Sequence, residues 1–172
     1  DGVEEAEQRD HVPYQDWARA GFLELCEGDI VDYSRVEEVI REAADAFDLI
    51  TLGLDPAMSW TLSQRLMQGG IEVLEISQTM LGMSPATKKL EVLIRAHQML
   101  HEHNTCARWN FGNVRCAVDG NENMKPMKNR STGRIDITVA WIIAMATAMV
   151  KEAAKPDLAA AMERADELAE VF

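Results

Sequence analysis

The stretch Ser131-Thr132-Gly133-Arg134-Ile135-Asp136 stands directly before an apolar run that extends from Ile137 to Met149. The run predicts a long buried helix, and it places Asp136 where a polar loop meets that helix. A carboxylate at such a boundary is costly to bury unless it is paired or binds a metal ion. The alternative is that Asp136 caps its own helix, a role worth about 1 kcal/mol.

A second carboxylate suits Asp136 as a partner. Residues 49–54 form a short apolar run that predicts a buried strand, and Asp55-Pro56 follows it. Ligands of α/β sheets gather at the carboxyl ends of strands, and paired carboxylates hold Mg²⁺ or Mn²⁺ in many nucleases. We therefore expect Asp55 and Asp136 to share metal ions. For Asp55, a plain Asp-Pro turn that ends the strand is the alternative.

The distribution of charge is more informative than its sum. The chain has 172 residues and a net charge of −12, which argues against a general nucleic-acid-coating protein. Residues 124–135 nevertheless contain no acid. This loop carries the candidate phosphate-binding residues Lys125, Lys128, Arg130, Ser131 and Arg134. A solvated loop with ordinary basic residues is the alternative.

The remaining patterns predict one α/β domain without a membrane segment. No apolar run reaches the roughly 18 residues that span a bilayer. We expect a tail with a short amphipathic segment at residues 1–20, a core at residues 21–151 and an acidic helix at residues 152–172. The core should contain strands near 22–25, 49–54, 71–76, 107–109, 114–118 and 123–127, and helices near 33–47, 59–67, 84–100 and 135–151.

Three histidines, His97, His101 and His103, surround Leu100. The spacing of His101 and His103 is two residues rather than the helical four of a zinc protease, so a solvated turn or a histidine at the edge of the site is expected. No glycine-rich ATP-binding loop is present in the sequence.

Taken in order, these segments resemble the C-terminal nuclease domain of the large terminase subunit of tailed bacteriophages, of the HK97-like type. The matching pieces are Val12–Trp17 with Gly21–Leu23, Gly28–Tyr33, Leu52–Pro56, Gln78, Met83–Pro85, His101, Arg108-Trp109, Asn113-Val114, Asn123–Pro126 with Lys128, and Ser131–Asp136. The resemblance implies an RNase H-like fold, with a mixed central sheet flanked by helices. It also implies a two-metal endonuclease that uses Mg²⁺ or Mn²⁺ to cut concatemeric double-stranded DNA. Asp55 matches the middle acidic position and Asp136 the last, while His101 would stand at the edge of the site.

The resemblance also has a gap. In the family the first acidic residue lies on a strand well before the Pro-Tyr-x-x-Trp segment, which here begins at Pro13. We therefore expect the first strands and their aspartate to be missing, the edge of the sheet to be open, and cleavage by this chain alone to be weak. The implied partners are DNA, the terminase ATPase domain, the small terminase subunit and the portal, in the cytoplasm of an infected bacterial host.

Three other functions remain open at this point. One is a non-catalytic packaging module that completes its sheet with a partner chain. Another is a different RNase H-like nuclease, such as a junction resolvase or a transposase, although such proteins are expected to have a more basic surface than a net charge of −12 provides. The third is a small-molecule α/β enzyme that uses Asp55 at a strand end.

Overall fold

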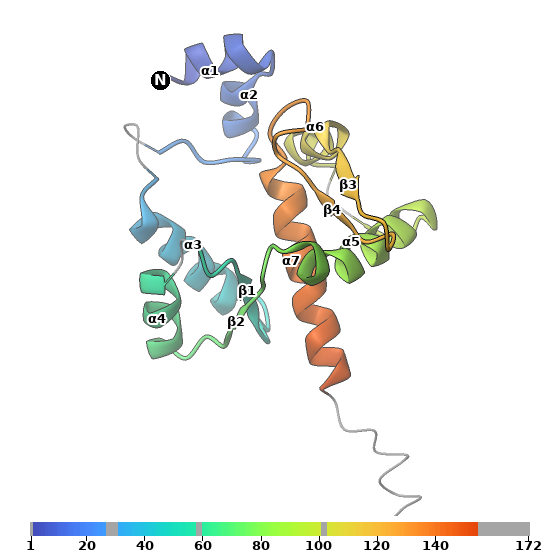
Figure 1. Ribbon diagram of the computed structural model, residues 1–172. Coiled ribbons are helices and arrows are strands. Elements are labelled where there is room, and N and C mark those ends of the chain that lie inside the picture. Colours follow the sequence, from blue (N-terminus) through green and yellow to red (C-terminus); the bar gives the residue numbers. More distant parts are fainter. Residues whose placement is uncertain (1, 27–30, 58–59, 101–102, 155–172) are drawn as a thin grey trace, which may run out of the picture.

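The computed structural model describes residues 2–26, 31–57, 60–100 and 103–154. In these residues the chain is a helix-rich mixed α/β domain (Figure 1). The helices are α1 (Val3–Asp10), α2 (Tyr14–Arg19), α3 (Tyr33–Ala46), α4 (Trp60–Gln68), α5 (Met80–Arg95), α6 (Thr105–Asn113) and α7 (Asp136–Ala153). The strands are β1 (Leu52–Leu54), β2 (Val73–Glu75), β3 (Cys116–Val118) and β4 (Met124–Pro126).

The strands form two separate pairs. β1 and β2 are parallel, with Leu52 opposite Val73, and α4 provides the crossover that parallel strands need. β3 and β4 are antiparallel and are joined by the predicted hairpin turn, in which Asp119 accepts hydrogen bonds from the backbone of Asn121 and Asn123. The prediction of one mixed central sheet is therefore wrong for the described residues, in which each pair remains a small sheet of its own.

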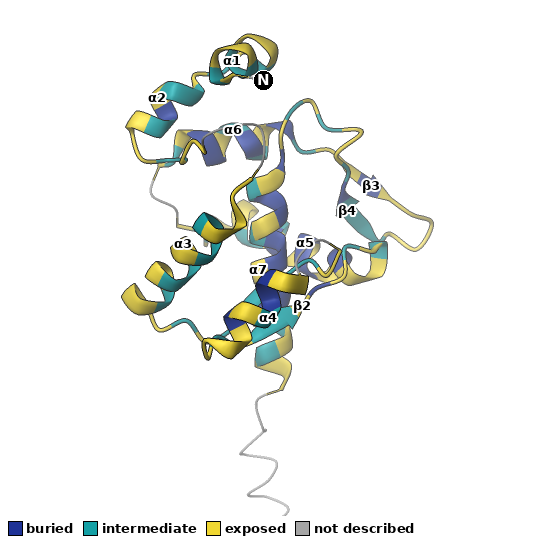
Figure 2. Ribbon diagram, turned by 90° about the vertical axis from the view of Figure 1, so that its left-hand side faces the viewer, coloured by how far each residue is buried: buried dark blue, intermediate teal, exposed yellow. Residues whose placement is uncertain are grey.

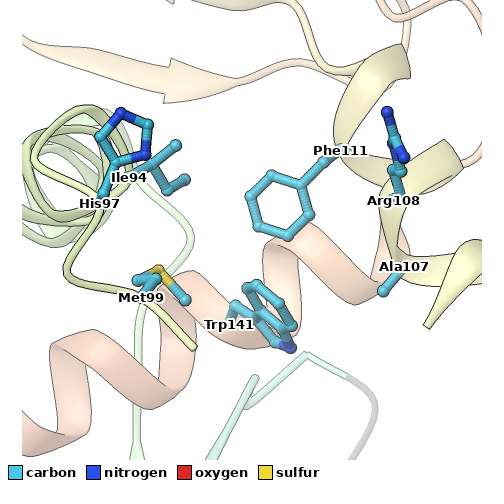
Figure 3. A pocket seen from close by; sticks show the side chains of 7 residues that line it. All are labelled: Ile94, His97, Met99, Ala107, Arg108, Phe111 and Trp141. Carbon is cyan, nitrogen blue, oxygen red and sulfur yellow. The ribbon is translucent and has the colours of Figure 1, made fainter. Parts of the chain in front are cut away.

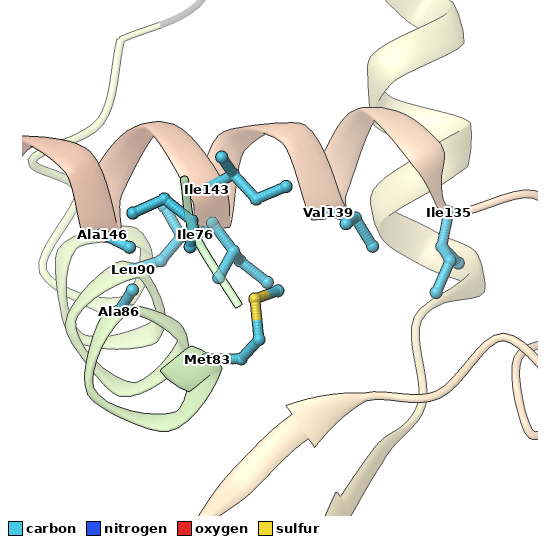
Figure 4. Packing of buried hydrophobic residues seen from close by; sticks show 9 residues of the cluster. Ile76, Met83, Ala86, Leu90, Ile135, Val139, Ile143 and Ala146 are labelled. Atoms are coloured by element: carbon cyan, nitrogen blue, oxygen red, sulfur yellow. The ribbon is translucent and has the colours of Figure 1, made fainter. Parts of the chain in front are cut away.

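The hydrophobic core lies between α5 and α7, with the end of β2 beside them (Figure 4). Its most deeply buried members are Met83, Ala86, Ile135 and Ile142. The predicted apolar helix is α7, and burial follows most of its length, whereas α3 has no buried residue (Figure 2). Because α7 also packs against α6 and β1, its position fixes the other elements around it.

The start of α3 was predicted correctly because a cap marks it. Asp32 caps α3, as expected, by accepting a hydrogen bond from the Ser34 amide at 2.8 Å. Other predictions were wrong. Residues 22–25 form no strand, and residues 107–109 lie in α6, not in a strand, because Asn104 caps that helix.

Helix α5 begins earlier than its predicted start at Ser84-Pro85. Thr79 caps it by accepting from the Gly82 amide, so Pro85 lies inside the helix. The Ser84 hydroxyl accepts instead from the Met124 amide at 3.0 Å and ties α5 to β4.

Helix α2 packs on α6 through three aromatic rings. The ring centroids of Tyr14 and Trp109 are 6.1 Å apart, and those of Trp17 and Trp109 are 5.5 Å apart. The short amphipathic segment expected at residues 1–20 is thus helical and attached to the rest of the domain. Most of the acidic helix expected at residues 152–172 lies outside the described residues, and the three-part division of the chain stays a prediction. No described helix is long and apolar enough to cross a membrane.

Candidate active site

Asp55 directly follows β1, at the carboxyl end of the strand. Its Oδ1 accepts a hydrogen bond from the Ala57 amide at 3.1 Å, and its Oδ2 accepts from Gln78 Nε2 at 2.5 Å. The first contact is the Asx turn expected of an Asp-Pro sequence. The second comes from the turn between β2 and α5, so an element distant in the sequence also orients this carboxylate.

Asp136 is the first residue of α7. Its side chain makes no capping hydrogen bond within the helix; instead its Oδ1 accepts from Lys128 Nζ at 2.6 Å. The turn before it is held from α6, where Asn113 donates to the Arg134 carbonyl at 3.1 Å. Asn110, also on α6 and buried, accepts from the Thr138 amide at 3.3 Å. The amide groups of α6 therefore position the start of α7 and leave the Asp136 carboxylate exposed.

Strand β1 crosses α7 at very short range. A side chain at Gly53 would meet Thr147 Oγ1, and its Cβ would lie 2.9 Å from Ile143 Cγ2. Asp136 precedes Ile143 by seven residues and Thr147 by eleven, spacings that return to nearly the same face of an α-helix. Asp136 thus lies on the stripe of α7 that faces β1.

The two acids also lie toward the same end of this crossing. Lys151, near the end of α7, pairs with Glu72 at 2.8 Å, just before β2 begins. Because β1 and β2 are parallel, both strands run from the C-terminal part of α7 toward its N-terminus. Asp55 lies two strand residues beyond Gly53, an advance of about 6.7 Å. Asp136 lies seven helix residues before Ile143, about 10.5 Å along the axis of α7. Both acids are therefore displaced from the contact between Gly53 and Ile143 in the same direction.

A groove of about 1050 Å³ follows this crossing. Its walls are residues 48–55, with Asp55 among them, and residues of α7 from Ala140 to Glu152 together with Ala154, which follows the helix. At the opposite end, the hydrogen bond from Lys151 lowers the pKa of the Glu72 carboxyl, which keeps that pair charged.

Two lysines from one short segment lie near the two acids, one beside each acid. Lys125, on β4, donates to the main-chain oxygen of Gln78 at 2.8 Å, the same residue whose side chain contacts Asp55. Lys128 follows three residues later and contacts Asp136. Because three residues of extended chain span at most about 10 Å, the β4 segment joins the surroundings of Asp55 to Asp136.

The other predicted phosphate-binding residues lie around the same loop. Arg130 and Arg134 are exposed, and Arg134 Nε is 3.8 Å from Asp10 Oδ2 on α1. The Ser131 hydroxyl donates to the Met127 carbonyl at 2.8 Å and accepts from the Arg115 amide, so it closes the turn. His101 lies outside the described residues.

The described residues contain no group of three or more histidine, cysteine, aspartate or glutamate side chains that could hold a metal ion. Asp55 and Asp136 supply hard oxygen donors of the kind that Mg²⁺ and Mn²⁺ prefer. Their donor chemistry therefore fits such an ion, but as two ligands and not as a complete set.

A second cavity, of about 270 Å³, lies between the end of α5, α6 and the middle of α7 (Figure 3). Phe111 and Trp141 are in contact in its wall, with ring centroids 4.7 Å apart and ring planes tilted by 55°. His97 and Arg108 complete its rim. Neither predicted metal ligand lines this cavity, so it is separate from the acidic site.

Sequence reasoning did not single out the three amide side chains that hold the acidic site. Gln78 and Asn113 lie within the segments that carry the resemblance, and Asn110 lies outside them. The available signal was the pair Asn110 and Asn113, one helical turn apart and directly after Trp109, which places two amides on one helix face.

The described residues thus form a mixed α/β domain with two carboxylates toward one end of a strand-helix crossing, beside lysines. Residues 2–152 match the family model described as "Terminase large subunit, endonuclease domain". The chain therefore belongs to the terminase large subunit endonuclease domain family.

Individual relatives agree with this assignment. Protein YmfN of Escherichia coli K12 is 31% identical over 141 residues, which cover 81% of this chain and 31% of the relative. The large terminase subunit of Enterobacteria phage HK97 is 30% identical over 151 residues, which cover 85% and 29%. The crystal structure of the HK97 bacteriophage large terminase superposes with a TM-score of 0.78 at 29% identity, covering 84% of this chain and 30% of that one. The chain thus spans about 30% of the length of these relatives.

Proposed function

We propose that this chain is the RNase H-like, metal-dependent endonuclease part of a viral DNA-packaging terminase, which cuts concatemeric double-stranded DNA. The observation that carries the proposal is the placement of Asp55 and Asp136 toward one end of the β1–α7 crossing, both tied to the β4 segment. The family match supports the same reaction class.

In this proposal Asp55 and Asp136 hold Mg²⁺ or Mn²⁺. Two such ions, when bound, activate a water molecule and stabilise the leaving 3′ oxygen of a phosphodiester. Lys128, Arg130 and Arg134 contact the DNA backbone, which gives position without sequence selection. The Ser131 hydroxyl would have a secondary role beside this loop.

Two carboxylates are too few for a complete two-metal site, so we propose that a further acidic ligand comes from outside the described residues. The chain alone should then bind metal weakly and cut slowly. In the infected bacterial host, the remaining terminase regions, the small terminase subunit and the portal are the proposed partners.

Metal binding tests the assignment of the two acids. Mn²⁺ binding should be followed by paramagnetic broadening of amide signals, which detects weak sites. Asp55→Asn and Asp136→Asn should each lose the broadening, whereas Asp45→Asn, on the exposed face of α3, should retain it. Unchanged broadening in both site variants would show that these carboxylates are not ligands.

Cleavage tests the need for a further ligand. Incubation of supercoiled plasmid with the chain and Mn²⁺ should give slow nicking at most. Rapid cutting that Asp136→Ala abolishes would overturn the proposal that another acid is required.

A second candidate function, a packaging module that completes its sheet with a partner chain, has its own support. The Leu52 amide donates to the Glu72 carbonyl, and the Leu54 carbonyl accepts from the Ile76 amide. The backbone groups of Leu52 and Leu54 therefore point toward the β2 segment. The intervening Gly53 presents its backbone groups to the other side, along the groove. Ile50, at the rim, is 69% exposed.

Stoichiometry discriminates between the two functions. A module of this kind should associate with a second chain through the groove, and Ile50→Glu should abolish that association in light-scattering measurements. If the chain stays monomeric at all concentrations and binds Mn²⁺ through Asp55, the result favours the nuclease function.

A further inference from the structure

Gln78 contacts the surroundings of the site in two directions. Its side-chain amide donates to Asp55 Oδ2 at 2.5 Å. Its main-chain oxygen accepts from Lys125 Nζ at 2.8 Å. One residue therefore links the carboxylate after β1 to a lysine on β4.

The backbone on both sides of Gln78 is fixed. Two residues earlier, the buried Ile76 donates its amide to Leu54 O at 2.8 Å, immediately before Asp55. One residue later, Thr79 caps α5. Close packing of Gly82 against the Ser77 carbonyl leaves no room for a side chain there. Gln78 thus projects from a turn that has little freedom to move.

The contact with β4 is also anchored. The buried Ser84 hydroxyl accepts from the Met124 amide at 3.0 Å, next to Lys125 in the sequence. This bond sets the position of β4 relative to α5. The distance between Lys125 and the Gln78 carbonyl is consequently determined by the packing of these two elements.

The chemistry of the Gln78 amide suits an orienting role. A neutral N–H donor fixes the plane of a carboxylate without neutralising its charge, and each carboxylate oxygen keeps a further lone pair for a cation. Asp136 differs, because its Oδ1 accepts from the charged Lys128. Asp55 instead accepts hydrogen bonds from two neutral donors, the Gln78 side-chain amide and the Ala57 backbone amide.

We propose that Gln78 is a positioning residue that orients Asp55 for a divalent cation, with Lys125 fixing the backbone of Gln78. This inference rests on the proposed role of Asp55 as a ligand. Partners that orient a metal ligand typically change metal affinity 10- to 100-fold when they are removed.

Gln78→Met tests the role, because methionine keeps the length of the side chain and removes the donor. It should need about tenfold more Mn²⁺, or more, to broaden the amide signals near residues 54–57. Its thermal midpoint should stay close to that of the unaltered chain, since Gln78 is only partly buried. Gln68→Met, at the exposed end of α4, is the matched control and should behave as the unaltered chain.

Gln78→Ala provides a second variant if Gln78→Met does not fold. Asp55→Asn separates the two hypotheses. If it leaves Mn²⁺ broadening unchanged, the proposed ligand role of Asp55 fails. If it abolishes broadening while the folded Gln78 variants retain the affinity of the unaltered chain, only the positioning role fails.

Discussion

Replacing Gly53 by alanine tests the close crossing of β1 and α7, on which the placement of the two acids depends. A Cβ at this position would collide with Thr147 Oγ1 and would lie 2.9 Å from Ile143 Cγ2 and 3.3 Å from the Ile143 carbonyl oxygen. Ordinary van der Waals contact begins at about 3.5 Å. Since one of these atoms is backbone, the strand has to move away from the helix.

The expected loss follows from this geometry. Overpacking a well-packed interior costs about 1–3 kcal/mol. For a chain of this size, each kcal/mol lowers the midpoint of thermal unfolding by about 2–4 °C, so Gly53→Ala should melt about 2–12 °C below the unaltered chain. Because Asp55 follows only two residues later, the same variant should also bind Mn²⁺ more weakly.

Gly112→Ala is the control for this experiment. Gly112 lies in α6 with nothing within 4 Å of an added Cβ. Alanine is a better helix former than glycine, so this variant should be unchanged or more stable by up to about 1 kcal/mol. Calorimetry of both variants gives the comparison. A Gly53→Ala protein as stable as the unaltered chain would refute the close crossing of β1 and α7.

Three further predictions concern the surroundings of the acids. Asn110→Ala should lower the free energy of unfolding by about 1–3 kcal/mol in urea titrations, because it leaves a buried amide in the first turn of α7 without its acceptor. Burial and the hydrogen bond to Asp10 raise the pKa of Tyr14 to about 12. The folded chain therefore keeps this proton while the unfolded chain releases it near pH 10, so stability should fall as pH rises from 10 through 12, and less steeply in Tyr14→Phe. Lys128→Ala should bind Mn²⁺ up to about fivefold more tightly, because the exposed pair with Asp136 is worth at most about 1 kcal/mol, and should bind DNA more weakly.

Matched variants distinguish these effects from general ones. Asn129→Ala, in an exposed turn, should leave stability unchanged; an equal loss would contradict the capping role of Asn110. Identical pH profiles for Tyr14→Phe and the unaltered chain would show that Tyr14 does not hold its proton. Arg130→Ala should weaken DNA binding without changing Mn²⁺ affinity, and equal Mn²⁺ affinities in the two basic variants would exclude competition at Asp136.

The elements that sequence predicted well are those with a local signal. The apolar run after Asp136 is long enough to be read as a helix, and it is α7. Asp32 marks the start of α3 because its cap lies within two residues. The hairpin of β3 and β4 has a turn that needs no distant partner.

The failures have a common physical cause, which is that distant contacts decide the outcome. Ser84-Pro85 has the local form of a helix start, but the Ser84 hydroxyl is used by β4 and Thr79 caps the helix instead. The strands pair into two small sheets, and this pairing depends on contacts between residues that are distant in the sequence. The orientation of Asp55 by Gln78 joins residues 23 positions apart, and no spacing rule predicts such a contact.

The candidate acids themselves could be selected from sequence because Asp55 directly follows an apolar strand and Asp136 directly precedes an apolar run. That rule says where a carboxylate stands along the chain but not which way it faces. Its direction comes from Gln78 on one side and from Asn110 and Asn113 on the other. Their roles as ligands stay a prediction until metal binding is measured.

Because Gly53 packs against Ile143 and Thr147, the number of residues between Asp136 and Ile143 determines the direction in which the Asp136 carboxylate points. Each residue of an α-helix turns the chain by about 100° and advances it by about 1.5 Å. Inserting one residue between Asp136 and Ile143 would therefore swing the carboxylate by more than a quarter of a turn, away from β1, while the helix itself remained intact. A loop absorbs such a change easily, whereas this part of α7 tolerates substitutions far better than insertions or deletions.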